Sequence, residues 1–169
     1  RKARETPGAA VDLLHLKIKE GVTIAVLPTL KSTTTYLLLE QETWFEKELS
    51  FVMHYLRPGM TVVDIGANAG VYSLAMARAV GPDGRVFAFE PGSATRRLLE
   101  TGRTLNGADN LEILGDAVSD GERPGHLQHG HSSELHALGE ATESAEAVTI
   151  TSLDAAASHH RWLPSRRPS

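Results

Sequence analysis

Hydrophobic and polar residues between positions 61 and 118 alternate in blocks that predict a parallel sheet. The run TVVDIGA is an apolar strand that ends in an acid and a glycine, and the VYSLAMARAV segment after it has a helical period. A second strand, RVFAFEP, a helix capped by Ser93 and a third strand, LEILGDAVSD, repeat this order. Because strands that alternate with helices form right-handed crossovers, the predicted fold class is α/β, with a doubly wound, Rossmann-like sheet.

The flanking segments have different patterns. Residues 22–28 and 33–41 are rich in β-forming residues and are separated by a short polar link, which predicts an N-terminal β-hairpin. A helix is expected next, because five apolar residues recur on one face: Phe45, Leu49, Val52, Met53 and Leu56. Beyond the third parallel strand the pattern weakens to a loop-rich segment with a short strand near Leu127 and another at residues 148–153.

Three acids follow the predicted parallel strands. Asp64, Glu90 and Asp116 each lie at or near the carboxyl end of a strand, where open parallel sheets bind their ligands. Glu90 follows Gly70 by twenty positions (90 − 70), the separation typical of a ribose-binding acid. A carboxylate accepts hydrogen bonds from both ribose hydroxyls, and Asp116 could accept one from the exocyclic amine of an adenine. These acids predict a nucleoside-containing ligand, with solvated strand ends as the alternative.

The glycine turn after the first parallel strand indicates which nucleoside-containing ligand would bind. It reads Asp-Ile-Gly-Ala-Asn-Ala-Gly, and Gly66 and Gly70 allow the backbone to approach a ligand. A dinucleotide site favours Gly-x-Gly-x-x-Gly, because its amides contact a pyrophosphate. Asp64 would repel a diphosphate but would attract an ammonium group. The predicted cofactor is therefore S-adenosylmethionine, and a nicotinamide-dependent oxidoreductase is the less favoured alternative.

Several segments resemble one family when they are taken in order. WFEKELSFVMHYLRPG, VVDIGANAGVYSLAMA, VFAFEP, RTLNGADN, LEILGDAVSD and VTITSLDAA are similar to the FkbM family of class I S-adenosylmethionine-dependent methyltransferases, over residues 44–155. The resemblance implies that Asp64 and the glycine turn hold the methionine end, Glu90 the ribose, and Asp116 with the Ala117 backbone the adenine. The expected cofactor-binding residues are Glu46, Asp64, Gly66, Ala67, Asn68, Gly70, Tyr72, Glu90, Pro91, Asp116 and Ala117.

The resemblance also implies a function and a domain division. We expect methyl transfer to a hydroxyl of a small molecule, a sugar or a natural product, with no catalytic residue assigned. Residues 1–43 form the lead-in and hairpin, residues 44–157 a partial cofactor-binding core, and residues 158–169 an irregular, disordered tail. The family continues into further strands after SLDAA, so a sheet truncated at its C-terminal side is expected. Self-association through its open edge is one expected consequence. The alternative is a non-catalytic chain that needs a partner.

Composition limits the expected partners. A formal charge of −4 and a pI near 6.1 offer no basic face, so no nucleic acid is expected. The chain has no cysteine and no apolar run of membrane-spanning length, which agrees with a cytoplasmic protein without a membrane partner. We expect no metal site, because no carboxylate or cysteine completes a ligand set with the clustered histidines His126, His129, His131 and His136.

Overall fold

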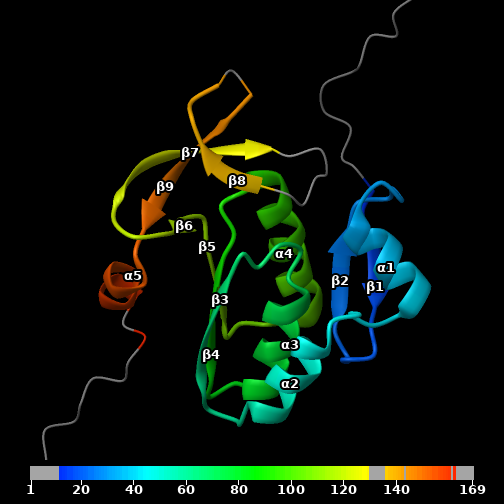
Figure 1. The fold of residues 1–169 in the computed structure, drawn as a ribbon. Coiled ribbons are helices and arrows are strands. Elements are labelled where there is room, and N and C mark those ends of the chain that lie inside the picture. Colours follow the sequence, from blue (N-terminus) through cyan, green and yellow to red (C-terminus); the bar gives the residue numbers. More distant parts are fainter. Residues whose placement is uncertain (1–11, 130–135, 143, 161, 163–169) are drawn as a thin grey trace, which may run out of the picture.

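Parallel strands form the centre of the structure. Strands β3 (Thr61–Ile65), β4 (Arg85–Phe89) and β5 (Leu111–Leu114) lie side by side in that order, and helices α3 (Val71–Val80) and α4 (Ser93–Asn106) connect them (Figure 1). This alternation confirms the α/β, Rossmann-like prediction. The structure is a computed structural model, and it describes residues 12–129, 136–142, 144–160 and 162.

The central sheet lies between two layers of helices. Helices α2 (Lys47–Tyr55), α3 and α4 cover one face, and α5 (Leu153–His160) lies on the other (Figure 1). The strand period of two divides β4 between the layers. Val86 and Ala88 are buried in the cluster beneath α3 and α4, whereas Phe87 and Phe89 pack with α5 and Trp162. Since α5 continues to His160, residues 158–160 are helical, and most of the expected irregular tail lies outside the described residues.

The N-terminal hairpin exists, but with a different partner strand from the predicted one. Strand β2 (Thr23–Val26) pairs antiparallel with β1 (Leu14–Lys17), which precedes it. The prediction of a strand at residues 33–41 was wrong, because Thr33–Gln41 is helix α1. The Ser32 side chain caps this helix by accepting a hydrogen bond from the Thr35 backbone N–H at 3.1 Å.

The third sheet covers one end of the core. Its order is β6 (Ala117–Val118), β9 (Glu146–Thr151), β7 (Arg123–His129) and β8 (His136–Gly139), with β7 and β8 forming an antiparallel hairpin. The short strand expected near Leu127 is therefore confirmed. Figure 1 shows this sheet beyond the carboxyl ends of β3 to β5, next to the start of α4.

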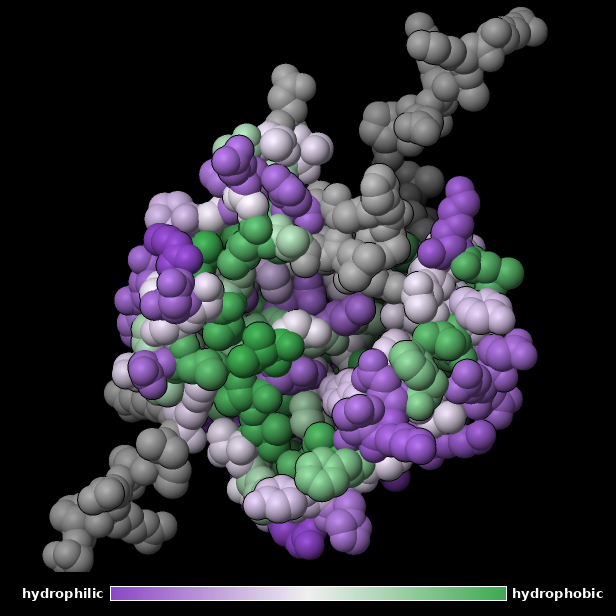
Figure 2. All heavy atoms as spheres, viewed as in Figure 1, coloured by the Kyte–Doolittle hydropathy of each residue, from purple (hydrophilic) through white to green (hydrophobic). Residues whose placement is uncertain are grey.

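Strand β3 forms an edge of the central sheet. Among the described residues it pairs with β4 alone, and Ile65 at its end is 52% exposed. Apolar side chains gather over this strand and the neighbouring side of the sheet (Figure 2). Within the described parts of the chain, no helix has both the length and the apolar character that a membrane crossing requires.

Candidate functional site

The register of the central sheet brings its acidic residues to one edge. Asp64 pairs with Ala88, and Phe89 pairs with Leu114, so β3, β4 and β5 end next to one another. Gly66 and Ala67 then donate their backbone N–H groups to the Phe89 carbonyl, each at 2.9 Å. The glycine turn is therefore folded over the end of β4.

The two glycines of the turn meet different surroundings. Both have positive φ, +80° at Gly66 and +91° at Gly70, as does Asn68 between them at +51°. A Cβ atom on Gly70 would lie 2.2 Å from Leu99 Cδ1 on α4, so a side chain here would displace the end of Leu99. A Cβ on Gly66 would meet nothing within 4 Å, which leaves open space beside the turn.

Asp64 has a carboxylate whose charge is disfavoured. Burial raises its pKa above the usual value, and the negative charge of Glu90 raises it further. The Ser73 hydroxyl, on the first turn of α3, donates a hydrogen bond to Asp64 Oδ2 at 2.5 Å and partly offsets these effects. A cation that approached Asp64 would relieve the remaining cost of the buried charge.

Glu90 connects the glycine turn to the start of α4. Its side chain is 5% exposed, Oε2 accepts a hydrogen bond from the Asn68 backbone N–H, and Oε1 accepts one from the Gly92 N–H, both at 2.9 Å. A carboxylate has about four acceptor positions, so both oxygens retain capacity for further donors. Asp116 differs, because no described residue donates a hydrogen bond to its carboxylate.

A cavity of about 240 Å³ lies at this edge of the sheet. Six of the predicted cofactor-binding residues line it: Gly66, Asn68, Glu90, Pro91, Asp116 and Ala117. The remaining walls are Ile65, Phe89, Thr95, Val118, Leu127 and Leu138. Asp64, Ala67 and Gly70 do not line the cavity, although they belong to the strand end and turn beside it.

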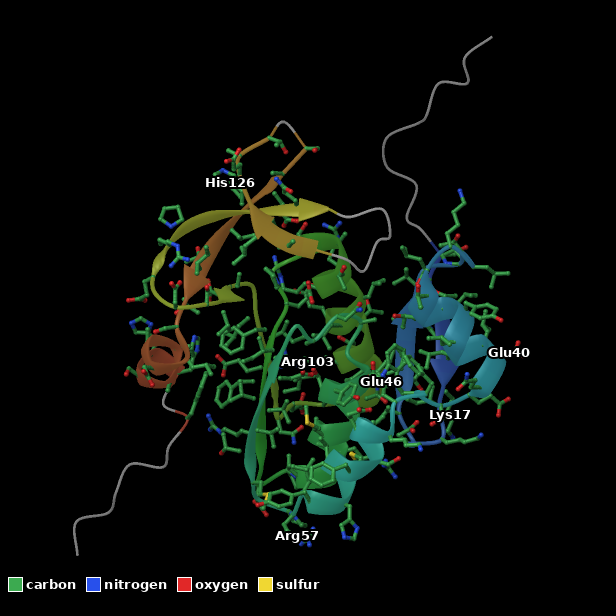
Figure 3. The ribbon with its side chains drawn as sticks, viewed as in Figure 1. Lys17, Glu40, Glu46, Arg57, Arg103 and His126 are labelled. Atoms are coloured by element: carbon green, nitrogen blue, oxygen red, sulfur yellow. The ribbon has the colours of Figure 1, made fainter. Side chains whose placement is uncertain are left out.

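Glu46 and Tyr72 form a separate hydrogen-bonded group. Tyr72 donates its hydroxyl to Glu46 Oε2 at 2.6 Å, and Trp44 Nε1 donates to the same oxygen at 2.9 Å. The Tyr72 hydrogen bond, followed by that of Trp44, lowers the pKa of Glu46. Burial raises the pKa of Tyr72, and the charges of Glu46, Glu48 and Asp64 contribute in the same direction. Glu46 is the N-cap residue of α2 and is labelled in Figure 3.

Of the clustered histidines, only His126 has a side chain that the structure describes. His126 is half-buried on β7 (Figure 3). His129 and His136 are described only as backbone pairs between β7 and β8, and His131 lies outside the described residues. Among the residues that the structure describes, no three His, Cys, Asp or Glu side chains are grouped to hold a metal ion.

Sequence reasoning missed the residues that the third sheet brings to the cavity. Leu127 on β7 is 3% exposed, and Leu138 on β8 is 41% exposed, yet both line the cavity. Glu146 on β9 accepts from the Ser93 backbone N–H through both carboxylate oxygens, at 3.0 and 3.2 Å. The expected cap by the Ser93 side chain was wrong, because Gly92 is the N-cap and makes no side-chain hydrogen bond. No local pattern marks Leu127, Leu138 or Glu146.

The chain matches no family model and no curated protein, but parts of it resemble solved structures. A putative rRNA methylase from Clostridium thermocellum is 26% identical over 42% of this chain and 39% of its own, with a TM-score of 0.40. A SAM-dependent O-methyltransferase from Thermotoga maritima is 25% identical over 55% of this chain and 36% of its own, with a TM-score of 0.41. In the complex of aTrm5 with tRNALeu, the matched chain is 20% identical over 63% of this chain and 29% of its own, with a TM-score of 0.42.

These structures correct the expectation about partners. The match spans between 29% and 39% of the length of each of the three. One of them is a complex with tRNA, so the prediction of a small-molecule acceptor without nucleic acid was wrong. The reason is that net charge describes a whole chain, and a formal charge of −4 does not exclude nucleic acid as an acceptor.

Proposed function

We propose that this chain binds S-adenosylmethionine and acts as a class I methyltransferase. The observation that carries the proposal is the half-buried Asp64 carboxylate with its raised pKa, beside a glycine turn with open space at Gly66. A carboxylate in this state is stabilised by a ligand ammonium group and destabilised by a diphosphate. The arrangement therefore favours S-adenosylmethionine over a dinucleotide.

The residues around the cavity fit the three parts of this cofactor. Asp64 would hold the methionine ammonium group. Glu90 would accept from the ribose hydroxyls with the acceptor positions that its two backbone hydrogen bonds leave. Asp116, which no described residue bonds, would accept from the adenine amine, beside the Ala117 backbone. Pro91, next to Glu90, would add an apolar wall to this part of the cavity.

The contribution of the chain to catalysis would be orientation. The bound cofactor would supply an electrophilic methyl group on its sulfonium. Asp64 and Asp116 would fix the two ends of the cofactor and Glu90 its ribose, so that the methyl group is presented in line to an acceptor. Because its pKa is raised, Tyr72 stays protonated at neutral pH, where it donates to Glu46 and cannot serve as the general base.

A thermal-shift experiment tests the proposal against its rivals. S-adenosylhomocysteine should raise the melting temperature, because a ligand at one hundred times its Kd adds about 2.7 kcal/mol to the unfolding free energy. NAD should leave it unchanged. A shift with NAD alone would support an oxidoreductase, and no shift with either ligand would contradict cofactor binding.

The finer parts of the proposal are the FkbM family and transfer to an oxygen atom, and they rest on the sequence resemblance. The alternative, a cofactor-binding chain without activity, is separated by a second measurement. Transfer of the labelled methyl group from S-adenosylmethionine to a component of an acceptor extract, with formation of S-adenosylhomocysteine, would support catalysis. Binding without turnover across such extracts would favour the alternative.

A further inference from the structure

Three residues of the third sheet form a row beside the candidate cofactor cavity. Leu127 on β7 pairs in register with Leu138 on β8 and with Glu146 on β9, and both pairings are antiparallel. Residues directly opposite one another in antiparallel strands project from the same face of the sheet. The side chains of Leu138, Leu127 and Glu146 therefore share one face.

One end of this row is fixed by a contact to the core. Glu146 accepts from the Ser93 backbone N–H with both oxygens, at the N-terminus of α4, where the helix dipole favours a negative charge. Leu127 and Leu138 line the cavity together with Glu90 and Asp116. The Glu146 hydrogen bonds thus tie β9, which pairs with β7, to the start of α4.

Leu127 and Leu138 differ in exposure. Leu127 is 3% exposed and is part of the packed structure, whereas Leu138 is 41% exposed at the same cavity. An apolar side chain that is exposed beside a cavity loses contact with water when a flat apolar group binds against it. Among the parts of the proposed cofactor, the adenine ring is such a group, and Asp116 lines the same cavity.

We propose that Leu127 and Leu138 form an apolar cover for the adenine of the cofactor, and that Glu146 is the positioning residue that holds this cover in place. The inference rests on the proposed function, since it names further residues of the same site. It assigns to the β7–β8 hairpin a part in purine binding, in addition to the parallel sheet.

The test measures binding of S-adenosylhomocysteine and of adenosine by calorimetry. Leu138→Ala should weaken both by the same factor, about three- to tenfold, the loss expected for a partly exposed apolar contact. The matched control is Leu105→Ala, because Leu105 on α4 is 42% exposed and does not line the cavity. It should leave both affinities unchanged.

Glu146 is tested through its coupling to Leu138. Glu146→Ala should weaken adenosine binding, whereas Glu146→Gln, which keeps an oxygen to accept from the Ser93 N–H, should restore most of it. In the Leu138→Ala background, Glu146→Ala should cause a smaller further loss than it does in the wild type, because one of the two leucines that it positions is already gone. Fully additive losses would show that Glu146 acts by some other route and would overturn its positioning role.

The outcomes separate this inference from the proposed function. A wild-type chain that binds neither ligand would overturn both. Wild-type binding that Leu138→Ala leaves unchanged would overturn the adenine cover alone, as would a loss confined to S-adenosylhomocysteine, because the contact would then be to the amino-acid end.

Discussion

The Asp64 carboxylate destabilises the ligand-free protein but is suited to bind a cationic ligand. Its side chain is half-buried, its pKa is raised by partial burial and by the charge of Glu90, and the hydrogen bond from Ser73 offsets only part of this. A residue that destabilises the free chain but suits a cationic ligand is typical of a binding site. The two effects can be separated by removing the charge.

Asp64→Asn should raise the unfolding free energy of the ligand-free chain at neutral pH and weaken cofactor binding. The folded-state pKa of Asp64 is raised, so its favourable contribution is complete below the unfolded pKa of about 3.8 and is lost as pH rises through the folded pKa. The gain in the variant should therefore be largest at pH 7 and should vanish near pH 4. Urea titrations at several pH values measure it.

Asp64→Asn should weaken the binding of S-adenosylmethionine by at least tenfold, since charge-assisted hydrogen bonds contribute about 1.5–3 kcal/mol. Wild-type binding should weaken as pH falls through the Asp64 pKa, and Asp64→Asn should bind with little pH dependence. Equal affinity in the two proteins at pH 7 would remove Asp64 from the site.

Gly66→Val should abolish binding while the fold persists, because its side chain would fill the open space beside the turn. The left-handed φ of +80° adds a strain of about 1–2 kcal/mol. Gly59→Val is the matched control, since Gly59 has a φ of +85° and an equally open Cβ position but does not line the cavity. Calorimetry should show binding in the Gly59 variant only, and binding in both would place the ligand elsewhere.

At the scale of elements, β4, the glycine turn and α4 meet through one side chain. Glu90 accepts from the Asn68 N–H in the turn and from the Gly92 N–H before the helix, both at 2.9 Å. If it also binds a ribose, its position is determined by the fold before any ligand arrives. Structural and binding losses should therefore appear together when it is changed.

Glu90→Ala should lower the unfolding free energy by about 1–3 kcal/mol, because two backbone N–H groups lose their acceptor. It should weaken the binding of S-adenosylhomocysteine by a similar free energy. Glu90→Gln keeps one acceptor oxygen and should recover part of both. Glu100→Ala, at an exposed position on α4, is the control and should change neither. Denaturation and calorimetry on the same samples measure the unfolding free energy and the affinity. A change in only one of them would contradict a role of Glu90 in both folding and binding.

The sequence predicted elements best where the pattern is local and repeated. The apolar strands and helices from residue 61 to residue 114 were predicted correctly, because each has a clear period and a glycine boundary. Thr33–Gln41 was assigned as a strand from its threonines, but the Ser32 cap and the following leucines form helix α1. The Ser93 cap failed for a different reason: α4 begins at Ser93, so Gly92 takes the N-cap position, and the Ser93 N–H donates to Glu146, more than fifty residues away.

At the scale of the molecule, the candidate site is assembled from segments that are distant in the sequence. The acids at Glu90 and Asp116 could be predicted, because parallel strands end at a common edge. Leu127 and Leu138 could not, because their place depends on how the third sheet docks on α4. A second, larger hollow lies near Gly84 and Asn110, which precede β4 and β5, at the opposite end of the same strands.

Hydrogen exchange with and without S-adenosylhomocysteine should separate the two ends of the sheet. Exchange should slow in the segments that meet at the candidate site, which are residues 65–70, 89–95, 116–118, 126–128 and 137–139. Segments at the opposite end, around Gly84 and Asn110, should keep their rates, because the ligand would make no contact there. NAD serves as the control and should slow neither end. Because local opening sets these rates, a bound ligand slows exchange only where it stabilises the closed state. Slowing around Gly84 and Asn110 with unchanged rates at residues 65–70 would place the ligand in the other hollow and would contradict the site described above.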